Sequence, residues 1–230
     1  MTEALVLGLA LVAAEAAPPP PPALHWEKIH DRDGIAVFRS TAPGTSVLAF
    51  KGEGRVDAPL LKVAHVIIDP ARGTEWVDSL AESRKIRAQG PFEFLEYDRF
   101  SMPLFVKDRD LVTRVTVEAD VPARRVAVRF VSVEDAGTPP TGRCVRAQLV
   151  HSMFELHDEG GAATLVKAEI LCDPRGSLPK WLVNYFQKSW PVETLKALRR
   201  QSVRADVTEQ PDLRRLWTNA TSLPSSRSGP

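Results

Sequence analysis

Residues 173–200 read DPRGSLPKWLVNYFQKSWPVETLKALRR, and this stretch decides the fold class. Residues 173–176 end a strand, Ser177 is a suitable helix N-cap, and Pro179 suits a first helical turn. We therefore predict a long helix over residues 181–205, which spans about 38 Å at about 1.5 Å per residue. A helix of this length can cross a small sheet. Its broad apolar face comprises Leu182, Val183, Phe186, Trp190, Leu195 and Leu198.

The chain before this helix alternates apolar and polar residues with a period of two, which indicates β-strands. Glu159-Gly160-Gly161 predicts a hairpin between the last two strands. Gly52 and Gly54 indicate a bend in their strand or the close approach of another segment. The predicted strands cover residues 35–40, 47–56, 83–88, 92–100, 110–118, 125–133, 145–157 and 162–171.

One helix interrupts these strands. Its apolar stripe runs from Leu60 to Ile68, Asp57 is a suitable N-cap, and Asp69-Pro70 ends it. The chain is therefore expected to be α+β, with a curved antiparallel sheet wrapped around the long C-terminal helix and a hydrophobic cavity between them. The inward positions expected from the alternation are Leu111, Thr113, Val115, Val117, Val126, Val128, Phe130, Thr164, Val166, Ala168 and Ile170.

Composition excludes several classes of protein. The 230 residues carry 30 Lys and Arg against 29 Asp and Glu, so no basic excess indicates a nucleic-acid binder. Two cysteines, Cys144 and Cys172, are too few for a disulfide scaffold or a four-thiolate zinc site. We expect them to be unbridged. Pairing His157 with Ala162 in the hairpin leaves them roughly 10 Å apart, and a disulfide needs Cα atoms within about 7 Å.

The two ends are expected to lie outside the domain, which we place at residues 24–205. Residues 1–23 combine an apolar run with a polyproline spacer, which predicts a signal-peptide-like leader and a periplasmic or secreted protein. The leader has no basic residue, however, and an apolar N-terminal helix on a cytoplasmic protein is the alternative. The tail, residues 206–230, is expected to be partly disordered, although Leu213, Leu216 and Trp217 could dock a short helix.

A series of short matches, in order along the chain, resembles the StAR-related lipid-transfer (START) domain family, and in particular its bacterial single-domain members. The resemblance implies a helix-grip fold with a hydrophobic tunnel for one lipid, such as a sterol or phospholipid, and no obligatory metal or organic cofactor. We expect a monomer that meets membranes transiently. The matching segments are Trp26-Glu27, residues 33–37, Phe50-Lys51-Gly52, Ile68-Asp69 before Trp76, residues 101–110, Arg146-Ala147 and residues 173–184.

The resemblance also implies a polar group inside the tunnel. Glu96 occupies the position of a family glutamate that lies near the polar end of the ligand, although an outward orientation is the alternative. The family's accompanying arginine aligns with Val115, a departure that argues against sterol-type polar recognition. Arg109 and Asp110 are interpreted as a structural charge pair. The candidate cavity residues are Phe94, Glu96, Leu111, Thr113, Val115, Val128, Phe130, Val166 and Phe186.

The segment from Arg99 to Asp108 is unusually apolar for a connection between strands. We predict that Met102, Leu104, Phe105 and Val106 form a membrane-facing gate to the tunnel. The alternative is that this loop folds back and plugs the core.

Two further functions remain open, a polyketide cyclase or aromatase on the same fold and a ligand-gated interaction module. No acid–base pair converges convincingly in the sequence, so we expect a binding protein rather than an enzyme. His151, Glu155 and His157 share a strand face, but residues at this spacing lie too far apart to hold one metal ion.

Overall fold

The computed structural model describes residues 24–103, 106–178 and 180–222. The predicted leader and the last eight residues lie outside this range. The elements are β1 (Glu27–Arg32), β2 (Ile35–Ser40), β3 (Ala49–Val56), α1 (Leu60–Ile68), the short helix η1 (Pro70–Glu75), β4 (Leu80–Gly90), β5 (Glu93–Phe100), β6 (Arg109–Asp120), β7 (Arg125–Ser132), β8 (Val145–Arg146), β9 (Gln148–Asp158), β10 (Thr164–Asp173), α2 (Lys180–Ser202) and α3 (Pro211–Ser222).

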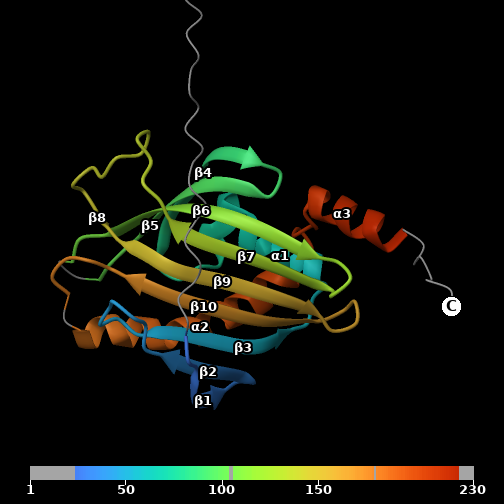
Figure 1. Cartoon of the computed structure of the whole chain (residues 1–230), viewed down its shortest axis with the longest axis horizontal. Coiled ribbons are helices and arrows are strands. Elements are labelled where there is room, and N and C mark those ends of the chain that lie inside the picture. Colours follow the sequence, from blue (N-terminus) through green and yellow to red (C-terminus); the bar gives the residue numbers. More distant parts are fainter. Residues whose placement is uncertain (1–23, 104–105, 179, 223–230) are drawn as a thin grey trace, which may run out of the picture.

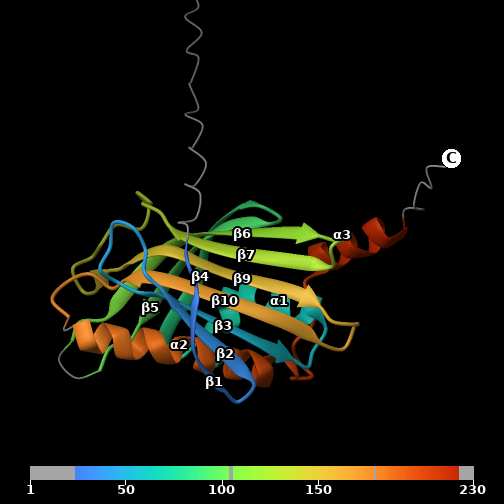
Figure 2. The same cartoon turned by 60° about the horizontal axis from the view of Figure 1, so that its bottom comes forward.

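The strands form a single curved sheet in the order β1-β2-β3-β10-β9-β7-β6-β5-β4, with β8 paired to β6. Neighbours along this path are antiparallel, and only the short β8 pairing is parallel. The sheet curves around α2, which contacts β2, β3 and β10, while α1 packs against β7, β9 and α2 (Figures 1 and 2). The predicted helix-grip architecture is confirmed.

Glycines allow α2 to lie directly on β3. A Cβ atom on Gly52 would stand 2.8 Å from Cβ of Pro191, and one on Gly54 would stand 2.8 Å from Cδ2 of Leu195. Both distances are shorter than real Cβ contacts allow. The close approach that these glycines indicate is therefore the approach of the C-terminal helix.

Helix α1 starts and ends as its sequence predicts, but its N-terminus is capped differently. Residues 60–68 bury six apolar side chains against the sheet and α2. The N-cap position is Pro59, which offers no side-chain hydrogen bond, whereas the Asp57 carboxylate pairs with Arg55. At the other end Asp69 accepts a hydrogen bond from the Ala71 amide and so begins η1.

The register of the β9–β10 hairpin differs from the prediction by three residues. Thr164 pairs with Asp158 and Leu165 with His157, rather than Ala162 with His157. The reason is the turn, in which the Asp158 carboxylate accepts the Gly160 and Gly161 amides and lengthens the loop. Cys144 and Cys172 form no disulfide, as predicted.

The segment after α2 folds back onto the domain. The Lys62 ammonium donates to the Arg204 carbonyl oxygen at 2.7 Å, and Arg72 contacts Asp206 at 2.8 Å. Helix α3 follows, with Leu213 fully buried and Trp217 packed against the main core. Within the described residues, no helix is both long enough and apolar enough to cross a membrane.

Candidate ligand-binding site

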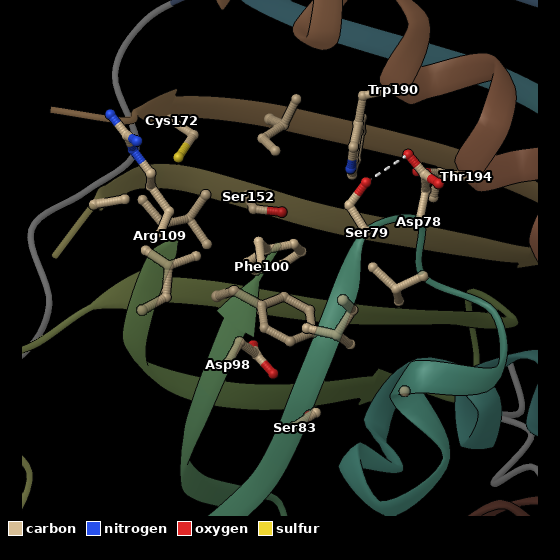
Figure 3. Close-up of a pocket in the computed structure, with 18 of the residues that line it drawn as sticks. Asp78, Ser79, Ser83, Asp98, Phe100, Arg109, Ser152, Cys172, Trp190 and Thr194 are labelled. Carbon is tan, nitrogen blue, oxygen red and sulfur yellow. Dashed lines mark hydrogen bonds between the residues drawn. The ribbon is translucent and has the colours of Figure 1, made fainter. Parts of the chain in front are cut away.

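A cavity of about 310 Å³ lies between the sheet and the first half of α2 (Figure 3). Strands β5, β6, β7, β9 and β10 supply one wall, while η1, the residues that follow it and α2 supply the other. Three aromatic side chains contact one another beside it. The rings of Phe130 and Phe154 meet edge to face with centroids 6.1 Å apart, and those of Phe154 and Trp190 are tilted with centroids also 6.1 Å apart. The apolar lining includes Ile67, Leu80, Phe100, Leu111, Phe130, Leu149, Phe154, Ile170, Val183 and Trp190.

The predicted cavity residues divide into two groups. Glu96, Leu111, Thr113 and Phe130 line the cavity, and the glutamate faces inward.

The second group comprises Phe94, Val115, Val128 and Val166, which do not line the cavity. They point to the same side of the sheet but are at most 5% exposed in the solid core beneath α1 and the second half of α2, where helix side chains fill the space. Phe186 lies in α2, and its side chain is outside the described part of the chain.

Two buried carboxyl groups form the polar end of the cavity. Glu96 and Asp98 lie two residues apart on β5, so both side chains face inward, and they are only 7% and 9% exposed. Burial raises the pKa of both groups. The neighbouring Asp98 charge and a hydrogen bond between the two carboxyls raise the pKa of Glu96 further, well above its usual range. Ionisation of the pair is therefore disfavoured, and more strongly at Glu96 than at Asp98.

Polar atoms beside this pair have no partner within the described residues. Asp98 Oδ1 and Thr113 Oγ1 are buried without a hydrogen bond. Thr113 lies directly opposite Glu96 in the β5–β6 register, and Ser83 lies directly opposite Asp98 in the β4–β5 register. Because buried polar atoms are normally satisfied, these atoms indicate where a polar group of a ligand is bound.

The predicted pairing of Arg109 with Asp110 is wrong, because neighbouring strand residues point to opposite faces. The Arg109 guanidinium donates to the carbonyl oxygens of Pro174, Lys107 and Arg175 at 3.1, 2.6 and 3.0 Å. Asp110 instead accepts two hydrogen bonds from Arg146, each of 3.1 Å. Arg109 thus fixes the connection between β10 and α2, and burial lowers its pKa.

The predicted gate loop is only partly described. Met102 and Pro103 line the cavity, whereas Leu104 and Phe105 lie outside the described residues. Asp108 closes the base of the loop, because its carboxylate accepts from Arg99 at 2.8 Å and from the Met102 amide at 3.1 Å. The membrane-facing role of this loop stays a prediction.

Sequence reasoning missed Asp98, Ser83, Ser152 and Trp190, which also line the cavity. A signal for Asp98 was available, because it shares the strand face of Glu96. The same signal was available for Ser152, which shares a face of β9 with the buried Phe154 and Leu156.

The histidines of β9 are satisfied on the outer side of the sheet. His151 contacts Glu169 at 2.9 Å and His157 contacts Glu155 at 2.6 Å. Across the described ranges, no three His, Cys, Asp or Glu side chains group as a metal site requires. Burial also raises the pKa of the Cys172 thiol to about 12, so this sulfur is not an activated nucleophile.

The curved antiparallel sheet around the C-terminal helix, with a cavity between them, defines the class of helix-grip proteins. Within this class, the chain belongs to the START domain family, whose model matches residues 24–205. It is 24% identical to bovine phosphatidylcholine transfer protein over 74% of this chain and 81% of that protein.

Solved structures agree with this assignment. A STAR-related lipid transfer protein from Xanthomonas axonopodis is 27% identical, with a TM-score of 0.68 over 78% of this chain and 99% of that chain. Human STARD10 is 20% identical, with a TM-score of 0.73 over 86% and 82%.

Proposed function

We propose that this domain holds one hydrophobic ligand, a lipid, non-covalently in its cavity and carries it between membranes. The observation that carries the proposal is the cavity itself, which is lined mainly by apolar side chains and has a few polar atoms at one end. This is the usual composition of a ligand pocket, in which apolar walls bind and polar groups orient. The lipid-transfer relatives support the same conclusion, although they do not identify the ligand.

Apolar contact supplies the affinity in this proposal. Each Å² of apolar surface removed from water contributes about 25 cal/mol, so an acyl chain or ring system that buries several hundred Å² binds without any covalent step. The carboxyl pair then selects the orientation of the ligand. The apolar end of the ligand is expected beside Phe130, Phe154 and Trp190, because these aromatic side chains supply apolar wall away from the carboxyl pair.

The test is to fill the cavity. Ser152 is 4% exposed and points into the cavity from β9 (Figure 3), so Ser152→Phe places a ring where the ligand is expected. Met153→Phe is the matched control, because Met153 is the next residue and faces the other side of the sheet.

Both variants are incubated with vesicles of total bacterial lipid, and bound lipid is measured by native mass spectrometry. We expect wild type and Met153→Phe to carry lipid and to move a fluorescent lipid between vesicles. We expect Ser152→Phe to do neither, although thermal denaturation shows that it is folded. Equal lipid loading of the two variants contradicts the proposal.

A further inference from the structure

In the described part of the chain, the cavity wall carries buried carboxyl groups but no basic side chain that is free to pair with them, and this imbalance indicates the charge of the ligand. Arg109 is the one basic residue among the described residues that line the cavity. Its guanidinium is engaged with three backbone carbonyl oxygens and turns away from the cavity centre (Figure 3). Glu96 and Asp98, in contrast, are both buried in the wall.

Two buried carboxyls on one face of β5 disfavour double ionisation, and the pKa of Glu96 is raised further than that of Asp98, so a single negative charge on the pair belongs to Asp98. The nearest cation that acts on the pair is the Lys85 ammonium, which lies on β4 opposite Glu96. Lys85 is not part of the cavity wall, and its ammonium lies 4.4 Å from the ring centroid of Phe94. A buried charge without a partner in its own cavity is costly unless a bound group compensates it.

The hydrogen-bonding atoms point to the same kind of group. Asp98 forms hydrogen bonds with Glu96 and Ser83, but its Oδ1 is buried without a partner within the described part of the chain and can only accept. Thr113 is 1% exposed, and its Oγ1 is a second buried atom without a partner on the same wall. Among the described residues of the cavity wall, a phosphate or carboxylate would meet no free basic group and would face the Asp98 charge.

We propose that this end of the cavity binds a protonated amine, so that the ligand is an amphiphile with a cationic amino group on an apolar body. The ammonium donates to Asp98 Oδ1 and Thr113 Oγ1, and its charge balances the carboxyl pair. This inference rests on the proposed function and adds the chemical class of the ligand. Glu96 holds its proton against Asp98 and thereby keeps that carboxylate aimed at the ligand.

The test compares three ligands with the same chain, dodecylamine, dodecanol and dodecanoate, each below its micelle concentration at pH 7. Each competes with the neutral fluorescent probe N-phenyl-1-naphthylamine for the purified protein. We expect the amine to displace the probe at about tenfold lower concentration than the alcohol, since a charge-assisted hydrogen bond is stronger than a neutral one. The carboxylate is expected to be the weakest competitor.

Asp98→Asn removes the charge and keeps the shape of the side chain, so the preference for amine over alcohol should fall to within about twofold. Glu118→Gln is the control, because it removes one negative charge from an exposed position on β6. Melting temperatures show that both variants are folded. If Asp98→Asn is not, Thr113→Val is the second variant, because it removes the other acceptor, Thr113 Oγ1, and should also reduce the preference for the amine.

A wild-type protein that prefers dodecanoate, or that binds amine and alcohol equally, overturns this inference while leaving lipid binding in place. An amine preference that survives in folded Asp98→Asn also overturns it. Failure of the wild type to take up the probe or any of the three ligands counts against the proposed function itself.

Discussion

Two neighbouring residue pairs on β5 and β6 mark the boundary between cavity and core. Glu96 pairs with Thr113, and both line the cavity, whereas Phe94 pairs with Val115, and both are packed in the core. All four side chains point to the same side of the sheet. The change occurs within one step along the strands, because α1 covers the second pair and leaves space over the first.

This boundary makes substitutions of the same kind behave differently. Val128 is fully buried in the core, so Val128→Phe must displace packed neighbours, and we expect it to lower the free energy of unfolding by about 1–3 kcal/mol. Ser152→Phe adds its ring to an open cavity and is expected to cost clearly less. Urea denaturation of both variants measures the difference. Equal losses would show that the cavity is not open in solution.

At the scale of elements, the close contact between α2 and β3 depends on two glycines of β3, Gly52 and Gly54, which have no Cβ atom. In Gly52→Ala the new Cβ meets the rigid ring of Pro191 and cannot be accommodated by rotation, so we expect a loss of about 1–3 kcal/mol of stability. In Gly54→Ala the new Cβ meets the end of the flexible Leu195 side chain, and the expected loss is smaller.

Gly90→Ala is the control for this comparison, because a Cβ at this position of β4 meets nothing within 4 Å. Thermal and urea denaturation of the three variants should rank Gly52→Ala below Gly54→Ala and Gly90→Ala in stability. If Gly52→Ala is as stable as Gly90→Ala, the helix does not rest on the strand as described.

The elements also show how far sequence reasoning reaches. Alternation correctly predicted which side chains of β6, β7 and β10 face inward, since burial on one face imposes that pattern. It did not predict the β9–β10 register, which depends on one carboxylate, Asp158, that holds two turn amides. Nor did it separate cavity from core, because the position of a covering helix along the strands is a property of tertiary packing.

The same limit applies to the candidate site. Glu96 was found through its family resemblance, whereas its partner Asp98 follows from strand parity alone and was overlooked. Thr113 Oγ1 is without a partner because none of the side chains packed around it in the described residues forms a hydrogen bond with it, and this depends on the tertiary structure. No local sequence pattern contains that information.

At the scale of the whole molecule, carboxyl groups respond to pH in two opposite ways. A hydrogen bond from Arg87 holds the pKa of Asp135 below its usual value, and Lys196 does the same for Asp33. Such groups stabilise the fold above the pKa of the unfolded chain, and this contribution is lost as the pH falls. Glu96 behaves in the opposite way, because burial and Asp98 raise its pKa in the folded state.

The contribution of Glu96 can be isolated with Glu96→Gln, which keeps a hydrogen-bond donor toward Asp98 but does not titrate. Above pH 4.5, the usual pKa of Glu96, the unfolded chain releases this proton while the folded protein retains it. The folded state then binds more protons than the unfolded state, so rising pH destabilises the wild type relative to the variant. The slope is at most about 1.4 kcal/mol per pH unit, and it vanishes above the pKa of the folded state.

We therefore expect wild type and Glu96→Gln to be similarly stable at pH 4 and the variant to become progressively more stable between pH 5 and pH 8. Urea denaturation at each pH measures the difference, and Glu118→Gln should run parallel to the wild type because its side chain is exposed. Asp135 and Asp33 contribute equally to all three proteins, so their opposite pH dependence cancels when the free energies of unfolding of wild type and variant are subtracted at each pH. A wild type and Glu96→Gln that differ by a constant amount over this range would mean that Glu96 ionises normally, and the cavity would then contain two negative charges instead of one.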